Sequence, residues 1–515
     1  MKSVMDHSFS TNPEVDVQRS SFDRSHGHKT TFNAGELVPI FHDEVLPGDT
    51  FNLKMSAFGR MATPIYPIMD NQYLDVHFFF VPIRQLWDNW RMFMGERVDP
   101  DDDPTSLLVP QVNITAGASI GTFEDYIGIP TGVAGLSYCS FYWRAYQHIW
   151  NEWYRDQNLQ DSYAINRGDS DNTHTSGVSL KKRGKRHDYF TSCLPWPQKG
   201  DAVTLPLGEF ANVSFQGPDN SDVGVYSTIA GGSRGLDSNG TSNTVILNTA
   251  NTPTHQLYAD LSTATAATIN ELRQAFQVQK LLERDARSGT RYPELVETHF
   301  GVEFNDLTYR PEFLGGGSTV INQNPVAQTS STDATTPQGN LSSFGTVGFN
   351  DIGFTKSFNE HGIVMGIASV RTDLTYQQGL DRAFSRQTRY DYYWPSLAHL
   401  GEQAVLNKEI YADGNPVNDD GVFGYQERYG EYRYKKSLIT GKMRSSAASS
   451  LDAWHLSEEF GSLPALGDSF IQENPPMSRV LATPSEPHII LDTYFSMRCA
   501  RPMPLFGIPG FIDHF

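Results

Sequence analysis

The segment QYLDVHFFFV at residues 72–81 alternates apolar and polar side chains through its first half. Leu74, Val76 and Phe78 occupy every second position, and Asp75 and His77 lie between them. Successive side chains of a β-strand point to opposite faces of the sheet, so a period of two predicts a half-buried strand.

The same period recurs near the other end of the chain in HIILDTYFSMRC, residues 488–499, where Ile489, Leu491 and Phe495 share one face. The shorter segment IVMGIASV at 363–370 is more uniformly apolar and is also expected to be a strand. FGYQERYGEYRYKK at 423–436 interleaves tyrosines with charges and has no purely apolar side. We expect it to be an edge or contact strand.

Strands at both ends of the chain indicate one sheet system that is closed by the first and last segments, with insertions between them. Forty-three glycines, 29 prolines and 12% aromatic residues suit many strands joined by long connections. We therefore predict an all-β fold of the jelly-roll type with long loop insertions that contain a few helices. Helices are expected at about 139–157 and at 267–289, where Thr268 and Glu271 form a capping box and Gly289 ends the helix.

Composition divides the chain unevenly. Residues 1–35 are polar and lack a hydrophobic period, so they are predicted to be an arm that orders only against a neighbour, and 36–515 to be a single domain. Residues 208–262 and 315–349 are crowded with Gly, Ser, Thr and Asn and are predicted to be surface loops. Because long loops in compact domains are usually functional, 208–262 is expected to be an exposed insertion with a recognition role.

The charge balance limits the possible partners. Forty Lys+Arg against 59 Asp+Glu give a net charge of −19, so any nucleic-acid contact must be local or borrowed from a basic partner. No apolar run approaches the roughly 18 residues of a membrane span, and the first thirty residues lack an apolar leader. Three widely separated cysteines do not resemble a disulfide framework. These features together predict folding in the cytoplasm of the producing cell.

The sequence contains no persuasive catalytic motif, and neither an enzymatic activity nor a cofactor is predicted. GGSRG at 231–235 matches G-x-S-x-G but lacks the flanking strand and helix of a nucleophile elbow. His26 and His28 have no third metal ligand at a suitable spacing. His148 and Glu152 lie one helical turn apart, for which structural pairing is favoured over acid–base chemistry.

The run DPDDDP offers carboxylates that a calcium ion would accept. It lacks the glycine and the closing glutamate of an EF-hand loop, so a solvated turn is favoured, with an ion at a subunit contact as the alternative. The candidate ligands are Asp99, Asp101, Asp102 and Asp103.

Two cationic clusters could contact DNA or another subunit. The first could combine phosphate contact with base stacking, although a solvated loop or a subunit contact is favoured; it comprises Lys181, Lys182, Arg183, Lys185 and Arg186. In the second, a protein interface is favoured over nucleic acid because Arg, Tyr and Trp are enriched at interfaces; it comprises Arg382, Arg386, Arg389, Tyr390 and Trp394.

Several long segments resemble the major capsid proteins of the Microviridae, specifically the gokushovirus branch. They are distributed over nearly the whole chain and are RSSFDRSHGHKTTFNAGELVPIFHDEVLPGDTF (19–51), RPEFLGGG (310–317), SVRTDLTYQQGL (369–380), LGEQAVLNKEIY (400–411), FGYQERYGEYRYKKSLITGKMRS (423–445) and IPGFIDHF (508–515).

The resemblance implies an eight-stranded antiparallel jelly roll and a T=1 icosahedral shell of 60 copies around a circular single-stranded DNA genome. It implies assembly in the bacterial host cytoplasm with an internal scaffolding protein, and a small basic protein that accompanies the DNA in the virion. Residues 208–262 would form a protrusion at the threefold axes that contacts a host-cell receptor of unknown identity. The family provides no catalytic residues.

Two other classes of function fit the sequence less well. A β-sandwich carbohydrate-binding protein or glycosidase would also be acidic and rich in aromatic residues, and it would need two carboxylates about 5–10 Å apart. The lack of a signal peptide counts against it. A monomeric nonspecific DNA-binding protein is disfavoured by the net charge of −19.

Overall fold

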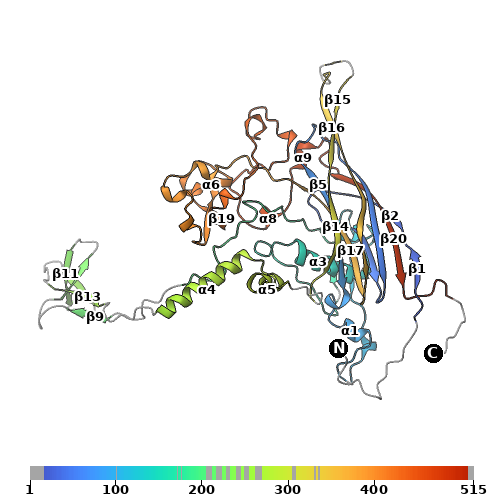
Figure 1. Cartoon of the computed structure of the whole chain (residues 1–515), viewed down its shortest axis with the longest axis horizontal. Helices are drawn as coiled ribbons and strands as arrows, with labels where there is room; N and C mark the ends of the chain where they lie inside the picture. Colours follow the sequence, from blue (N-terminus) through green and yellow to red (C-terminus); the bar gives the residue numbers. More distant parts are fainter. Residues whose placement is uncertain are drawn as a thin grey trace. The chain divides into compact units, whose positions relative to one another are not determined.

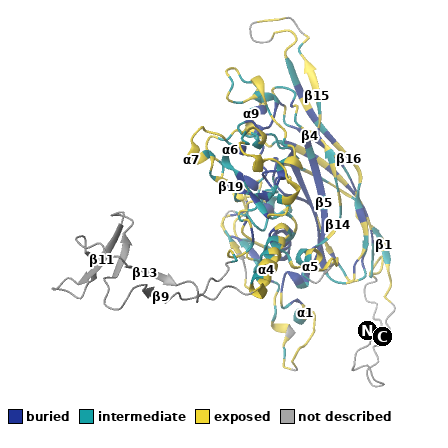
Figure 2. Cartoon of the chain, turned by 60° about the vertical axis from the view of Figure 1, so that its left-hand side comes forward, coloured by how far each residue is buried: buried dark blue, intermediate teal, exposed yellow. Residues whose placement is uncertain are grey.

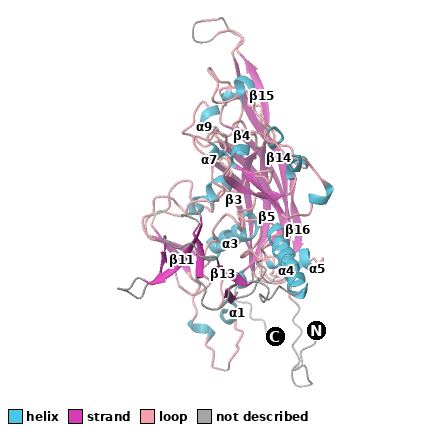
Figure 3. Ribbon diagram, turned by 90° about the vertical axis from the view of Figure 1, so that its left-hand side faces the viewer, coloured by secondary structure: helices cyan, strands magenta, loops and turns pink. Residues whose placement is uncertain are grey.

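The computed structural model describes residues 17–99, 101–170, 172–175, 177–203, 212–215, 223–227, 232–238, 245–248, 255–260, 269–303, 309–329, 332–333 and 337–507. The chain divides into a larger unit, 1–197 with 289–515, and a smaller unit, 198–288. The larger unit contains two long antiparallel sheets accompanied by short helices (Figures 1 and 3). The expected all-β class is thus confirmed.

The first sheet has six strands in the order β1-β20-β4-β16-β15, and β2 also pairs with β20. Strands from the two ends of the chain therefore lie side by side, as the sequence predicts. The strands are β1 (Ser20–Asp23), β2 (His26–Phe32), β4 (Thr50–Met61), β15 (Asn322–Ala327), β16 (Leu341–Ser357) and β20 (Ile489–Arg501).

The second sheet has four strands in the order β14-β5-β17-β3. They are β3 (Val38–Val45), β5 (Gln72–Pro82), β14 (Glu312–Val320) and β17 (Gly362–Thr372). One apolar core joins the two sheets: the ring of Phe41 lies 5.1 Å from that of Phe495, and Phe78 lies 5.7 Å from Phe354. The larger unit is therefore a β-sandwich.

The four-stranded sheet is buried on its second face as well. There it packs against α3 (Phe141–Ile149) and the π-helical turn η3 (Trp150–Tyr154), which together form the helix expected at 139–157. Side chains of both faces of β17 are buried, with Arg371 the one intermediate position. Burial on both faces explains why this strand is uniformly apolar and shows no period of two.

The outer face of the six-stranded sheet is exposed instead. Buried and exposed residues alternate strictly along β20 from Ile489 to Cys499, and the same alternation runs through most of β4. Figure 2 shows the resulting contrast between the buried central strands and the exposed β15.

The remaining elements are short. The larger unit also contains α1 (Trp90–Phe93), β6 (Gln111–Ile114), α2 (Phe123–Tyr126), β7 (Leu136–Cys139), β8 (Asn172–His174), α5 (Tyr292–Phe300), β18 (Glu402–Leu406), α6 (Asn407–Ile410), α7 (Pro416–Asp419), β19 (Val422–Glu427), α8 (Asp468–Ile471) and α9 (Met477–Val480). The smaller unit contains a five-stranded sheet of β9 (Asn212–Phe215), β10 (Val223–Ser227), β11 (Gly232–Ser238), β12 (Val245–Asn248) and β13 (His255–Asp260), and the helix α4 (Ile269–Arg287). Helix α4 confirms the helix predicted there, but Thr268 of its capping box lies outside the described residues.

The expectation that residues 1–35 form an arm that orders only against a neighbour is wrong for β1 and β2. The inward positions of β2 carry His28, Thr30 and Phe32, so its apolar period is hidden by polar side chains. Pairing with β20 orders it within the same chain.

The prediction of a surface loop at 315–349 is also wrong, because this segment contains most of β14, β15 and β16. Its glycines reflect close packing rather than a loop. A Cβ at Gly316 would lie 2.4 Å from the carbonyl oxygen of Val76, and one at Gly317 would lie 2.5 Å from Ile352 Cδ1. Similarly, part of the predicted loop 208–262 forms the strands β9–β13, with the G-x-S-x-G serine, Ser233, inside β11. No helix in the part of the chain that the structure describes is long and apolar enough to span a membrane.

We predict that Phe495→Ala lowers the stability of the larger unit by about 3–5 kcal/mol, the usual cost of truncating a buried phenylalanine. Phe495 is fully buried between the sheets, whereas the adjacent Tyr494 points outward and is exposed. Calorimetry should show a lower melting temperature for Phe495→Ala and a much smaller change for the control, Tyr494→Ala. Equal effects of the two substitutions would contradict the assignment of faces.

Candidate functional site

A lobe between β17 and β20 carries the second cationic cluster. It is built on the hairpin of β18 and β19, against which residues 189–194 also pack through two 2.8 Å backbone hydrogen bonds between Leu194 and Tyr425. Its separate apolar core consists of Tyr189, Phe190, Cys193, Tyr376, Val405, Ile410, Phe423 and Phe470.

Two loops pack together on this lobe. Tyr429 adopts a left-handed backbone conformation, with φ of 62°, directly after β19, and its hydroxyl donates to the carbonyl oxygen of Tyr392 at 3.1 Å. The ring of Tyr393 lies 5.2 Å from that of Tyr429, and the guanidinium of Arg386 lies 4.4 Å from the ring of Tyr432. The loops therefore form one continuous surface.

Arg382 and Arg386 support these loops from beneath. Arg382 donates to Glu409 at 2.9 Å, and Arg386 donates to Glu431 at 3.3 Å; both carboxylates are largely buried. Glu409 also accepts a hydrogen bond from the Tyr189 hydroxyl at 3.0 Å. Because removing either partner would strand a buried charge, we assign these two arginines a structural role.

Arg389 differs from them because it lies at the surface among aromatic rings. Its guanidinium is 5.0 Å from the ring of Tyr390 and 5.7 Å from that of Trp394, distances typical of cation–π contacts. Tyr390 is 58% exposed, and the rings of the neighbouring Tyr392, Tyr393 and Trp394 are also exposed.

The surface is basic as well as aromatic. Residues 428–444 contain six Lys or Arg and one Glu, in a chain whose overall charge is −19. The prediction of a single strand over 423–436 does not anticipate this half of the surface, because β19 ends at Glu427; Gly430 is the available signal for a turn. We call Arg389, Tyr390, Tyr392, Tyr393, Trp394, Arg428, Tyr432, Arg433, Tyr434 and Lys435 the basic–aromatic surface.

The first cationic cluster is mostly used inside the protein. Its backbone runs between two segments, with bridges from Lys182 to Glu36 and from Gly184 to Gln472. The ammonium of Lys181 lies 4.9 Å from the ring of Trp150, and Lys182 donates to Asn474 at 2.5 Å.

Two cations of this cluster are buried in ion pairs. Arg183 donates to Asp75 at 2.5 Å, and Arg371 donates to the same carboxylate oxygen at 2.9 Å. Burial alone would raise the pKa of Asp75, but the two guanidinium groups hold it below its usual value. Lys185 pairs with Glu458 at 2.8 Å. Arg186 alone among the five candidates is mostly exposed, with 64% of its side chain accessible.

The aspartate run forms its own turns. Asp102 accepts hydrogen bonds from the backbone nitrogens of Asp99 and Val98 at 2.9 Å, and Asp103 accepts one from the Thr105 hydroxyl at 2.6 Å and one from the Thr105 backbone nitrogen at 2.9 Å. These bonds lower the pKa of both carboxyls. Asp99 and Asp101 are exposed. Within the described residues, no group of three or more His, Cys, Asp or Glu could hold a metal ion.

His148 and Glu152 have separate partners. The Nε2 atom of buried His148 lies 3.1 Å from Gln85 Oε1, and burial lowers the pKa of this histidine to about 4. Glu152 lies 3.4 Å from Arg291, and burial raises its pKa. His26 packs its ring against Phe41 rather than forming a ligand set. Each residue therefore contacts a structural partner, but the expected pairing of His148 with Glu152 is not observed.

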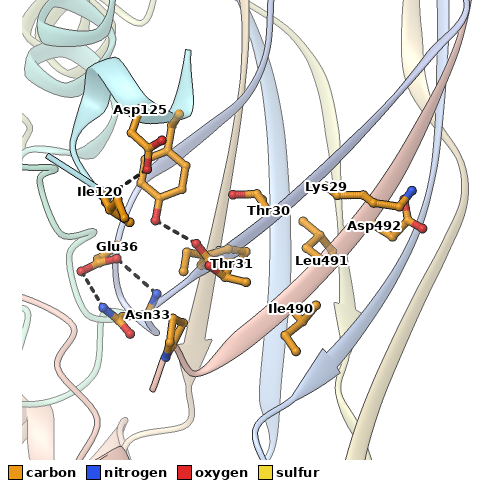
Figure 4. Close-up of a pocket in the computed structure, with 14 residues that line it drawn as sticks. Lys29, Thr30, Thr31, Asn33, Glu36, Ile120, Asp125, Ile490, Leu491 and Asp492 are labelled. Carbon is orange, nitrogen blue, oxygen red and sulfur yellow. Dashed lines mark hydrogen bonds and ion pairs between the residues drawn. The ribbon is translucent and has the colours of Figure 1, made fainter. Parts of the chain in front are cut away.

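A groove of about 760 Å³ lies beside β2, β20 and the loop that carries α2 (Figure 4). Its acidic groups already have partners: Glu36 accepts two hydrogen bonds from Asn33, and Asp125 accepts one from Gly121. Lys29 pairs with Asp492 at 3.0 Å across the strands. The groove thus presents no convergent set of free polar groups, and we assign it no ligand.

Comparison with known proteins gives consistent matches. The protein family described as "Capsid protein (F protein)" matches residues 10–511. Proteins named "Capsid protein VP1" are similar along almost their entire length. The Bdellovibrio phage phiMH2K protein is 46% identical, covering 99% of this chain and 98% of the relative. The Chlamydia phage 1 protein is 42% identical, with 99% and 98% covered, and the Spiroplasma virus 4 protein is 36% identical, with 98% and 97% covered.

Proposed function

Because this chain belongs to the phage capsid protein (F protein) family, in its gokushovirus-type Microviridae branch, we propose that 60 copies of it form a T=1 shell around a circular single-stranded DNA genome. The chain is a structural major capsid protein and a component of the virion, not an enzyme. The observation that carries the proposal is similarity to capsid proteins over nearly the full length of the chain.

We further propose that the β-sandwich is an eight-stranded jelly roll. The strands β2, β3, β4, β5, β14, β16, β17 and β20 would be its eight strands in chain order. The pairing orders β2-β20-β4-β16 and β3-β17-β5-β14 support this assignment, because in a jelly roll the last strand returns to lie between early ones. Strands β1 and β15 would be additions to the first sheet.

The proposed partners follow the charge of the chain. A coat of net charge −19 is poorly suited to neutralising a genome alone, which supports a small basic protein bound to the DNA. An internal scaffolding protein would guide assembly in the bacterial cytoplasm. Residues 208–262, which contain β9–β13, would form the exposed insertion at the threefold axes and contact a host receptor.

Subunit contact is the proposed role of the basic–aromatic surface. Exposed Tyr, Trp and Arg side chains are the types that dominate binding energy at protein interfaces. A neighbouring copy is acidic overall, so charge complementarity favours docking of this surface onto it. The internal ion pairs of Arg183 and Lys185 argue against this role, and against DNA contact, for those two residues.

Expression together with the scaffolding partner tests the shell directly. Sixty copies of 57.6 kDa give about 3.5 MDa, so we expect closed spherical particles near that mass in analytical sedimentation and negative-stain images. A stable monomer or small oligomer under these conditions would refute the proposal.

The triple substitution Arg389→Gln, Tyr390→Ser, Trp394→Ser tests the subunit contact. We expect the protein concentration needed for particle formation to rise at least about tenfold, because anchor residues at interfaces each contribute roughly 2 kcal/mol or more. Val417→Ser is the control, since Val417 is 83% exposed on α7 of the same lobe. Melting temperatures of the unassembled variants should match the wild type. Normal assembly of the triple variant would disprove this role.

Deletion of residues 215–250 tests the insertion. We expect intact shells, because this segment lies within the smaller unit, and loss of adsorption to host cells. Counting bound particles per cell measures the effect. Unchanged adsorption would show that host attachment lies elsewhere on the shell.

A further inference from the structure

Three exposed aromatic rings lie on the outer face of the six-stranded sheet: Phe344 on β16, which is 40% exposed, and two on the neighbouring strands β4 and β20. Phe58 on β4 and Tyr494 on β20 are each 55% exposed and point away from the core. Tyr494 pairs in register with Ser56, two residues from Phe58, so the two rings are diagonal neighbours with Cα atoms about 7–8 Å apart. We call this face, with its outward side chains, the open sheet face.

Glycines lie beside both rings. Phe58 pairs across the sheet with Gly348 on β16, and Tyr494 pairs with Gly27 on β2. A Cβ at Gly27 would find its nearest atom 3.6 Å away, and one at Gly348 would find its nearest atom 3.9 Å away; both atoms belong to the backbone. No side chain therefore covers either glycine, and each ring has free space at its flank.

The open sheet face also carries cations. Four cationic and three acidic side chains point outward, so cations are in slight excess here although the chain as a whole is acidic. The cations are Lys29, Lys54, Arg60 and Arg498, and the acidic residues are Asp23, Asp351 and Asp492. Lys29–Asp492 at 3.0 Å and Lys54–Asp351 at 3.8 Å are exposed pairs. Such pairs contribute little and can exchange for a phosphate. Arg60 makes no ion pair with any residue that the structure describes.

We propose that the open sheet face binds single-stranded DNA without sequence preference, stacking bases on Phe58 and Tyr494 and contacting phosphates through Arg60 and its neighbouring cations. Separate rings on a positively charged platform are the usual means of binding unpaired strands. Ser56 and Ser496 lie beside Tyr494, and Asp492 lies directly opposite Phe58, with the exposed Ile490 as its other diagonal neighbour. Polar and charged side chains thus interrupt the apolar surface, unlike the core of a protein interface. The inference rests on the proposed function, in which the shell encloses single-stranded DNA.

Binding of fluorescein-labelled dT20 to the unassembled full-length protein, followed by fluorescence anisotropy, tests the proposal. Phe58→Leu and Tyr494→Leu retain apolar area but remove the ring, and each should weaken binding about tenfold. Tyr390→Leu, on the basic–aromatic surface, is the matched control and should bind normally. Arg60→Gln should reduce the slope of log affinity against log salt by about 0.7. A 20-base-pair duplex should bind more weakly than dT20, because its bases are already stacked.

Gly27→Val separates binding from folding. It fills the flank of Tyr494 without removing the ring, and valine suits a strand, so the melting temperature should not fall while dT20 binding weakens. Unchanged binding in the Phe58→Leu, Tyr494→Leu double variant, or an equal loss in Tyr390→Leu, would overturn the proposal. Particle formation by the wild-type protein is measured separately. If the wild type forms shells but the double variant binds dT20 normally, this inference alone is refuted. If the wild type forms no shells, the proposed function is refuted.

Discussion

The position of β20 between β4 and β2 determines the rest of the structure. Ile489 pairs with Phe32 on one side and with Met61 on the other, so a strand near the end of the chain completes a sheet begun by its first strands. Two long segments, 83–311 between β5 and β14 and 373–488 between β17 and β20, must leave the sandwich strands and return to them. Insertions of this length are thermodynamically tolerable because the entropy of loop closure grows only logarithmically with length. Their cost is kinetic, since pairing so distant in sequence slows folding.

The two sheets are used differently. The central strands of the four-stranded sheet, β5 and β17, are buried between the core and α3, so they carry mostly apolar side chains. The six-stranded sheet has one outward face, and its strands alternate. Within the larger unit, the helices and the lobe lie mainly on the side of the four-stranded sheet, and the outward face of the six-stranded sheet forms a regular surface (Figure 1). The lobe that carries the basic–aromatic surface is one of the insertions and has its own apolar core.

Strands with a clear period or a continuous apolar run could be predicted from the sequence: 72–81, 363–370 and 488–499 correspond to β5, β17 and β20. β2 and β14 could not, because their polar or glycine-rich residues are specified by a partner strand rather than by local pattern. The cationic clusters show the same limit. Arg183 follows its partner Asp75 by 108 residues, and no local pattern reveals that its charge is internal. Conversely, the expected strand at 423–436 ends at Glu427, and the turn that follows places a second basic segment beside the loop that carries Arg389.

Exposed rings and cations recur on two surfaces of this chain, and the backbone beneath them determines what each can recognise. On the lobe, loops gather several rings and Arg389 into one cluster, a unique shape that requires a complementary partner surface. On the open sheet face, the register of β4 and β20 places Phe58 and Tyr494 as diagonal neighbours, with Ser56 and Asp492 at the other two corners. A ring separation fixed by the strand register suits the stacking of successive bases on the two rings. The same residue types are therefore assigned to a neighbouring subunit on the lobe and to an unpaired nucleic-acid strand on the sheet.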